Sequence, residues 1–256
     1  MEFINTTAKA LGLPGVICFG TGGMMDKHDI VYILRNGIDT DEIRYSLRSV
    51  EKYFPHGKVW FYGGKPAGIE PDEYVKVIQE GETRYAKVTN TIRQICMNDD
   101  ITEDFWLFND DFFVMQQITD LKPMISGTIS ERVQRIVDKF GFKSKYAKML
   151  EHTGDVLHAK GFDTLDYALH VPMLINRRKA LEALRAFPGE SMFRCIYGNY
   201  VGAEADLVSD MKVFEDEEPL KDTPFMSTDN KAWKSRAGEY LRERYPDPSR
   251  WETDNE

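Results

Sequence analysis

One stretch decides the fold: residues 29–62, which read DIVYILRNGIDTDEIRYSLRSVEKYFPHGKVWFY. Two short apolar runs, at 29–34 and 58–62, predict buried strands. Between the two runs, apolar side chains recur every three to four positions, which predicts a helix with one buried face. Because strand, helix and strand follow each other within about thirty-five residues, we expect a βαβ unit in a parallel sheet with a right-handed crossover.

The rest of the chain continues this alternation of strands and helices. Further helices are expected at 72–98, 130–140, 172–187 and 233–245, and extended segments at 104–108, 193–201 and 224–228. The mixed polar character of 141–168 predicts a helical lobe over roughly 130–190. Because no linker interrupts the pattern, residues 29–256 are expected to form a single α/β domain, preceded by an N-terminal extension at 1–28.

Composition narrows the classes of protein and partner. The chain has 256 residues, of which 42% are hydrophobic, enough for one sizeable core. Its formal net charge of -9 disfavours bulk nucleic acid and anionic membranes as electrostatic partners.

The three cysteines Cys18, Cys96 and Cys195 lie far apart without a CxxC pair. This spacing predicts neither a zinc site nor a disulfide framework, and it fits a reducing compartment. No apolar run reaches the length of a membrane span, and the first residues lack the pattern of a secretory signal. A cytoplasmic protein without a membrane span is therefore expected.

The strongest local signal for chemistry is Asn109-Asp110-Asp111, directly after the apolar strand expected at 104–108. In open α/β sheets, ligands bind beyond the carboxyl ends of the strands. Two carboxylates and an amide are hard oxygen ligands that suit Mg²⁺ or Mn²⁺, and such a cation can neutralise a diphosphate. The alternative is that these residues only form a turn and cap a helix.

Arg44 and Arg48 are four residues apart on the first expected helix, so they share a face. Like charges at this spacing repel unless an anion or nearby acids balance them, and phosphate is the anion that suggests itself. The alternative is structural, because Asp41 and Glu51 each lie three residues from one of the arginines.

Three further residues are weaker candidates. His170 stands in an apolar setting near Pro172, where a neutral imidazole suits a general base, although a lone histidine is more often structural than catalytic. Asp29 opens the first strand, where an acid can cap a turn or reach a nucleotide. Asn199 lies in a tight, aromatic, glycine-containing stretch, for which an ordinary loop is the alternative.

Five segments together resemble the Stealth family of sugar-1-phosphate transferases. The segment 29–37 (DIVYILRNG) is similar to the opening block of the family, and 41–55 (DEIRYSLRSVEKYFP) resembles its second block almost residue for residue. The segment 108–113 (FNDDFF) matches the downstream part of that block. The segment 170–177 (HVPMLINR) resembles the third block, and 225–230 (FMSTDN) the short fourth block, all in the order of the family.

The resemblance implies a glycosyltransferase A-like, Rossmann-type α/β core with a mainly parallel sheet and a helical insertion. It also implies a nucleotide-sugar donor and a divalent cation, Mg²⁺ or Mn²⁺. Asp110 and Asp111 then become metal ligands, with Asp111 and His170 catalytic. Substrate contacts would come from Asp29, Arg44, Arg48, Asn109 and Asn199.

Three functions stay open at this stage. The first is transfer of a sugar or sugar-1-phosphate from a nucleotide sugar to an acceptor hydroxyl, on a glycan or a similar molecule. The second is the same chemistry on a hydroxylated base in viral-type DNA, with the basic segment Lys231–Arg244 as its footprint. The third is a non-catalytic module that binds nucleotide sugars, which has no need of paired carboxylates.

Overall fold

A computed structural model describes residues 27–37, 40–189 and 192–253 of the chain. The N-terminal extension expected at 1–28 lies almost wholly outside these described residues. Within them, strands and helices alternate along the chain, and the predicted βαβ unit is confirmed: β1 (Asp29–Leu34), α1 (Glu42–Tyr53) and β2 (Val59–Gly63) follow one another, with β1 and β2 parallel.

The main sheet has the strand order β3–β2–β1–β4–β7. Its remaining strands are β3 (Glu73–Val75), β4 (Asp104–Phe108) and β7 (Met173–Asn176). β1 pairs in parallel with both β2 and β4, and β2 with β3, whereas β7 runs antiparallel to β4. The prediction of an α/β fold with a mainly parallel sheet is therefore confirmed, and the carboxyl ends of β1, β2 and β4 meet at one edge.

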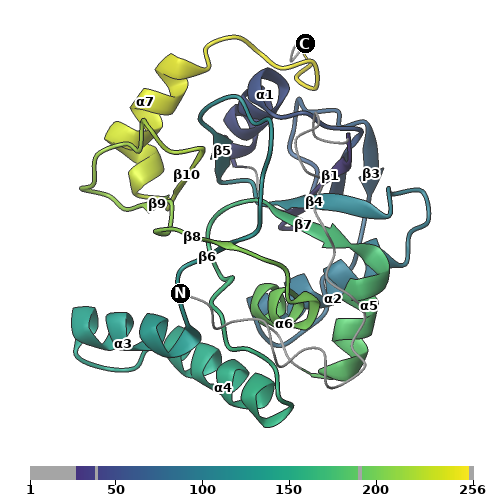
Figure 1. Cartoon of the computed structure of the whole chain (residues 1–256). Coiled ribbons are helices and arrows are strands. Elements are labelled where there is room, and N and C mark those ends of the chain that lie inside the picture. Colours follow the sequence, from purple (N-terminus) through teal and green to yellow (C-terminus); the bar gives the residue numbers. More distant parts are fainter. Residues whose placement is uncertain (1–26, 38–39, 190–191, 254–256) are drawn as a thin grey trace.

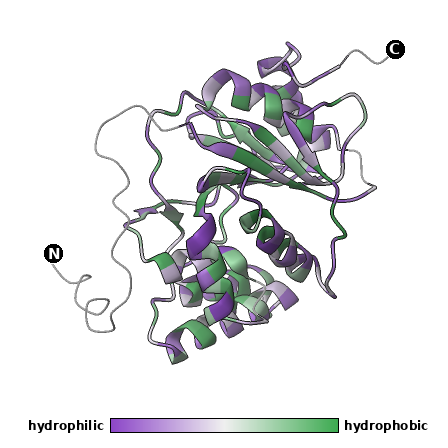
Figure 2. Ribbon diagram, turned by 90° about the vertical axis from the view of Figure 1, so that its right-hand side faces the viewer, coloured by the Kyte–Doolittle hydropathy of each residue, from purple (hydrophilic) through white to green (hydrophobic). Residues whose placement is uncertain are grey.

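Side chains of β1 enter two separate cores, because successive residues of a strand point to opposite faces. Ile30 and Tyr32 pack with α1 on one face. Val31 packs with α2 (Arg84–Cys96) and α5 (Arg177–Ala186) on the other face. Figure 1 shows α1 above the sheet and α2 and α5 below it. In Figure 2 the strands between these layers are mostly hydrophobic, which explains the continuous apolar runs.

A group of helices packs around a third core at the lower end of Figure 1. It contains α3 (Ile129–Phe140), α4 (Lys145–Ala159) and α6 (Phe193–Val201). α3 begins with a capping box, in which Thr128 accepts from the amide of Glu131 and the Glu131 carboxylate accepts from the amide of Thr128. The region expected to form a helical lobe therefore contains α3 and α4. The division into domains stays a prediction.

Two smaller sheets complete the described part of the chain. In the first, β10 (Phe225–Thr228) pairs antiparallel with β5 (Phe112–Val114) and parallel with β9 (Lys212–Val213). The 3-10 helix η2 (Ala232–Lys234) and helix α7 (Arg236–Arg244) pack against this sheet. In the second, β6 (Met124–Ile125) pairs in parallel with β8 (Asp206–Leu207).

Three predicted elements were wrong in part or in whole. The helix expected from residue 172 begins only at Arg177, because the preceding residues pair with β4 as the edge strand β7. The helix expected from residue 72 begins at Arg84, where Thr83 caps it, and residues 73–75 pair with β2 instead. The extended segment expected at 193–201 is helix α6, whose apolar residues fill the space beside α5. In each case tertiary packing outweighs the local pattern.

The turn after β2 depends on glycine. Gly63 has φ +105, and a β-carbon there would overlap the carbonyl oxygen of Leu34 at the end of β1. We expect Gly63→Ala to lower the free energy of unfolding by more than about 2 kcal/mol, because the strained φ and the overlap add.

Gly37→Ala is the matched control, since Gly37 has φ +71 but no atom within 4 Å of a built β-carbon. It should cost only about 1 kcal/mol from backbone strain. Urea denaturation of both variants measures the difference, and equal losses would contradict the steric account.

Candidate active site

The antiparallel edge strand brings two distant segments to the same edge of the sheet. Leu107, one residue before the end of β4, pairs with Met173 at the start of β7. Asn109-Asp110-Asp111 follows β4, and His170 precedes β7 by three residues. The segment after one strand and the segment before the other therefore meet beyond the carboxyl ends of the parallel strands, where α/β sheets bind ligands.

Asp111 is held by two groups from the three-stranded sheet. Its Oδ2 accepts a hydrogen bond from the Lys212 ammonium at 2.7 Å and from the Ser227 hydroxyl at 2.9 Å. The pairing of Ser227 with both Phe112 and Lys212 fixes this arrangement, because it aligns β5, β10 and β9. Asp111 is therefore an oriented carboxylate beside a positively charged side chain.

Asp110 and Glu42 carry negative charge that the surrounding protein balances poorly. Burial and the charge of Asp111 raise the pKa of Asp110 above its ordinary value, although Thr40 donates to its Oδ2 at 3.1 Å. Burial, followed by the charges of Asp110 and Asp111, raises the pKa of Glu42 to about 7. Three carboxylates therefore act on one another at the start of α1 and the end of β4, which favours binding of a cation.

His170 contacts the carboxylate of Asp210 through both its ring and its backbone amide, and no sequence pattern indicated this partner. Its ring Nδ1 lies 3.1 and 3.0 Å from the two oxygens of Asp210, and its backbone amide donates to Asp210 Oδ1 at 3.0 Å. Arg132 on α3 contacts the same carboxylate at 3.1 Å. Although burial acts to raise it, the contacts with His170 and Arg132 hold the pKa of Asp210 below its usual range.

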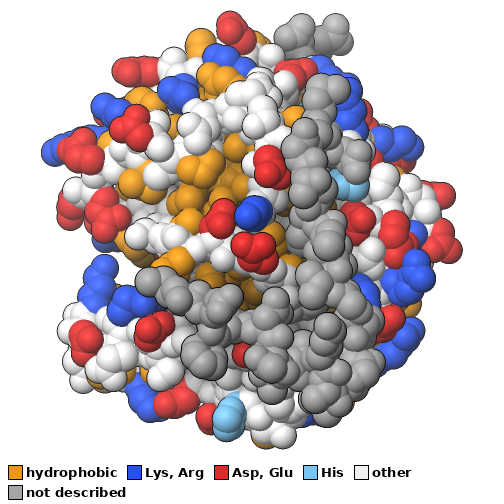
Figure 3. All heavy atoms as spheres, in the orientation of Figure 1, with side chains coloured by type: hydrophobic (Ala, Val, Ile, Leu, Met, Phe, Trp, Pro, Cys, Tyr) orange, Lys and Arg blue, Asp and Glu red, His pale blue; other side chains and the backbone are white. Residues whose placement is uncertain are grey.

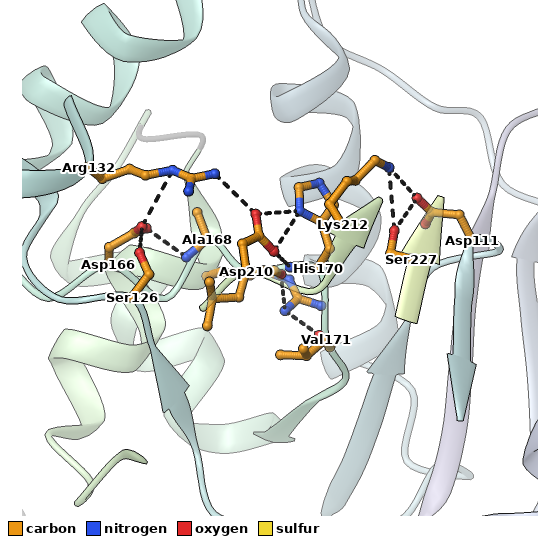
Figure 4. Close-up of polar contacts among 12 residues, drawn as sticks. Asp111, Ser126, Arg132, Asp166, Ala168, His170, Val171, Asp210, Lys212 and Ser227 are labelled. Atoms are coloured by element: carbon orange, nitrogen blue, oxygen red, sulfur yellow. Dashed lines mark hydrogen bonds and ion pairs between the residues drawn. The ribbon is translucent and has the colours of Figure 1, made fainter. Parts of the chain in front are cut away.

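The short segment from Asp210 to Lys212 links two groups of side chains. The first is His170 with Asp210 and Arg132, and the second is Asp111 with Asp110, Glu42 and Lys212; together they are called the cluster. Asp210 and Lys212 are two residues apart, so in an extended segment both side chains point the same way. Figure 4 shows Arg132, Asp210, His170, Lys212 and Asp111 in one row. On the face drawn in Figure 3, acidic and basic side chains gather around a hydrophobic centre.

Arg194 on α6 fixes the backbone around His170. Its Nη1 donates to the carbonyls of Leu169 at 3.2 Å and Val171 at 2.7 Å. Burial lowers the pKa of Arg194 to about 10, and its Nη2 is buried without a hydrogen-bond partner. The residues on either side of His170 are thereby held by helix α6, which packs around the same core as α3 and α4.

Residues of the second, third and fourth blocks meet at this cluster. Glu42 belongs to the second block and Asp111 to its downstream part, while Ser227 and Thr228 belong to the fourth. Ser227 donates to Asp111, and the Thr228 hydroxyl donates to Glu42 at 3.1 Å. His170 of the third block joins them through the segment from Asp210 to Lys212.

The two arginines expected to contact the donor have other partners. Arg48 donates two hydrogen bonds to the Glu252 carboxylate, at 2.8 and 2.7 Å, and one to the Tyr245 carbonyl. Arg44 pairs with Asp41 at 3.6 Å and donates to the carbonyl of Ala67 at 2.5 Å. These contacts favour the structural alternative, although a role in donor binding stays a prediction. Glu252 replaces the Glu51 that spacing suggested, because folding brings the C-terminal segment against α1.

The other three residues predicted to contact the substrate lie in different parts of the fold. Asp29 lies at the amino end of β1, away from the cluster, and its carboxylate accepts from the Lys58 amide and the Trp60 indole. Asn199 on α6 is buried and satisfied by hydrogen bonds to the backbone of Leu165 and Cys195. Both sets of contacts favour structural roles. Asn109 is exposed beside Asp110 at the strand end, so of the three it is the one next to the cluster.

Among the described residues, no group of three or more His, Cys, Asp or Glu side chains is arranged to hold a metal. Asp110 and Asp111 nevertheless fit Mg²⁺ or Mn²⁺, since Mg²⁺ is commonly held by one or two carboxylates together with substrate phosphates and water. Burial and then the charge of Asp111 raise the pKa of Asp110, and a bound cation would offset both effects.

A separate hollow, lined by residues such as Phe54, His56 and Arg250, contains no member of the cluster. It lies near the amino end of β2, because His56 and Gly57 precede that strand. None of the described helices has the length and apolar character needed to cross a membrane.

No protein family model matches this chain, and no curated protein matches it. Solved structures give distant likenesses. A complex of the galactosyltransferase LgtC with donor and acceptor sugar analogues is 12% identical, with 85% of this chain and 95% of that chain covered and a TM-score of 0.47. An active-site mutant of LgtC is 13% identical, with 84% and 94% covered and a TM-score of 0.46.

The glycosyltransferase GlyE of Streptococcus pneumoniae TIGR4 is 13% identical, with 67% of this chain and 42% of that chain covered and a TM-score of 0.33. At these scores and identities, a likeness carries no conclusion about chemistry. The case for a function therefore rests on the side chains of the cluster.

The raised pKa of Glu42 predicts a pH-dependent stability. Between its ordinary value of 4.5 and about 7, the unfolded chain has released this proton while the folded protein retains it. Stability therefore falls as pH rises through this window. Glu42→Gln removes the penalty and should stabilise the protein at pH 8 by on the order of 1–3 kcal/mol more than at pH 4.5.

Urea denaturation in EDTA at the two pH values measures this difference. Gln retains an oxygen that can accept from Thr228, so the hydrogen bond is conserved. A difference between variant and parent that is the same at both pH values would contradict the electrostatic account.

Proposed function

We propose that this protein is a glycosyltransferase-like enzyme that moves a sugar or a sugar-1-phosphate from a nucleotide sugar to an acceptor hydroxyl, with Mg²⁺ or Mn²⁺ as cofactor. One observation carries the proposal. The carboxylates of Asp110 and Asp111 and the imidazole of His170 lie at the same sheet edge, joined through Lys212 and Asp210. This edge is where parallel α/β sheets bind ligands.

Positive charge would stabilise the diphosphate of the donor as the nucleotide leaves. Asp110 and Asp111 would hold the cation, which supplies neutralisation of the diphosphate as the nucleotide leaves. Lys212 adds a fixed ammonium beside Asp111, and a positive charge there stabilises phosphate oxygens in the same way.

The acceptor side would be served by His170. The acceptor hydroxyl must lose a proton as it attacks, and a neutral imidazole near pH 7 suits that task. The His170 side chain is 33% exposed, so a hydroxyl can reach the ring. Attack on the β-phosphorus would release a nucleoside monophosphate, whereas attack on the anomeric carbon would release a nucleoside diphosphate.

The contacts of the basic C-terminal segment favour a glycan over DNA as the acceptor. Lys231 pairs with Glu215, and Arg236 pairs with Glu218. Arg244 donates to the carbonyl of Met115. These basic side chains serve internal contacts and do not form an unpaired basic stripe. A cytoplasmic location stays part of the proposal, in line with the free thiols of Cys96 and Cys195.

The proposed function predicts release of a nucleotide from one class of donor. Each common nucleotide sugar is incubated with the protein and Mg²⁺ or Mn²⁺, and the released nucleotide is identified by mass. We expect one donor to yield a nucleoside mono- or diphosphate, and EDTA to abolish release. Asp110→Asn and Asp111→Asn should each reduce turnover by about 100-fold or more, because the cation loses a charged ligand.

Asp120→Asn is the matched control, because Asp120 is an exposed aspartate outside the cluster and should leave turnover unchanged. Full activity in chelator would exclude the metal. Absence of turnover with every donor, together with tight nucleotide-sugar binding, would favour the binding module instead.

His170→Asn tests the acceptor side. Asn retains a polar side chain but cannot take up a proton at neutral pH, so transfer should fall by about 100-fold or more. Donor affinity should stay within about twofold, since the donor is bound by other groups. His158→Asn, on the exposed face of α4, is the control. Near-normal transfer by His170→Asn would leave His170 with a structural role and assign the proton to a carboxylate.

A further inference from the structure

We propose that Asp210 and Arg132 are positioning residues for His170. Asp210 fixes the orientation and tautomer of the ring, with Nε2 toward the acceptor, and Arg132 offsets the charge of Asp210. The meaning of this arrangement for catalysis rests on the proposed function, whereas the arrangement itself is measurable without any activity.

The tautomer follows from the chemistry of the contact. Both oxygens of Asp210 lie within hydrogen-bond distance of Nδ1, and an ionised carboxylate can only accept. Nδ1 therefore carries a proton, and in the neutral ring Nε2 keeps its lone pair. None of the described residues forms a hydrogen bond with Nε2. Since Asp210 also accepts from the backbone amide of His170, both the ring and its backbone are fixed.

Arg132 limits what this carboxylate does to the ring. A carboxylate alone beside an imidazole stabilises the protonated ring, which cannot act as a base. The Arg132 guanidinium lies 3.1 Å from Asp210 Oδ2 and carries a permanent charge. It thereby offsets the carboxylate and favours the neutral ring.

Arg132 is itself held between two carboxylates. Its Nε lies 3.9 Å from Asp166 Oδ2, and Asp166 is fully buried, accepting from the Ser126 hydroxyl at 2.5 Å and the Ala168 amide at 3.0 Å. The guanidinium is therefore fixed in place, with Asp166 on one side and the His170–Asp210 pair on the other (Figure 4).

The contact also links the site to the helical region. Arg132 lies on α3, which packs with α4 and α6 around their own core, and Arg194 of α6 holds the carbonyls that flank His170. Three charged side chains thus hold the ring, its partner or its backbone: Asp210 before β9, Arg132 on α3 and Arg194 on α6.

The test is ¹⁵N NMR of the histidine rings in the full chain, with pH titration. The chain has five histidines, and the signal lost in His170→Asn identifies the ring. In the parent protein we expect the Nδ1–H tautomer. In Asp210→Asn, the tautomers should mix and the ring should take up its proton at lower pH.

In Arg132→Gln, the ring should take up its proton at a pH higher by about half a unit or more, because Asp210 is then unbalanced. Arg132→Lys keeps the charge and should restore the parent value. Arg135→Gln is the matched control: Arg135 lies one turn further along α3 and donates to the Ser126 carbonyl and hydroxyl, without contact to Asp210. It should leave the titration unchanged.

Transfer rates measured on the same variants complete the test. The acid limb of the pH–rate profile should move with the NMR titration, while the KM for donor stays constant. If the NMR responses appear and no donor supports transfer, the positioning role stands and the proposed function fails. If transfer is found but the tautomer and the titration of the ring are unchanged in Asp210→Asn and Arg132→Gln, the inference is overturned.

Discussion

The structure depends on the antiparallel pairing of β7 with β4. A strand in a sheet runs either parallel or antiparallel to its neighbour. Each choice places the segment before the strand at a different edge of the sheet. Because β7 runs against β4, with Met173 opposite Leu107, the segment before β7 lies where β4 ends. This pairing brings His170 to the same edge as Asp110 and Asp111 across about sixty intervening residues.

The two parts of this edge, around His170 and around Asp111, differ in how far basic side chains offset the acidic ones. Around His170, the carboxylates of Asp210 and Asp166 share the guanidinium of Arg132. Around Asp111, Lys212 supplies one ammonium, but Glu42 and Asp110 have raised pKa values because burial and neighbouring acids disfavour their ionised forms. Three carboxylates around Asp111 thus have one ammonium among them, a larger deficit of positive charge than around His170. A divalent cation would remove that deficit.

The sequence predicted the fold where a single element decides its own structure. The run at 29–34 and the helical period at 42–53 need only their own residues, and both were confirmed. The segments at 172–176 and 193–201 were misassigned because their structures come from partners far along the chain. A short apolar run cannot distinguish a strand from a helix until its neighbours are known.

The same reason explains which parts of the candidate site were predictable. Asn109-Asp110-Asp111 stands out because it follows an apolar strand, and His170 because it opens a recognisable block. Asp210, Lys212 and Arg132 carry no local signal: a lone acid or base in a polar stretch looks like a solvated surface residue. For Arg48 the real partner is Glu252, 204 residues away, so spacing along the helix could not reveal it.

The central claim is that the cation and the nucleotide meet at Asp110 and Asp111. A crystal structure with Mn²⁺ and the nucleotide released from the active donor tests it most directly. The account predicts an anomalous manganese peak in contact with these carboxylates and with the phosphates, and Lys212 beside the same phosphates. Manganese and nucleotide bound elsewhere, for example at Arg44 and Arg48, with Asp111 still paired only with Lys212, would contradict it.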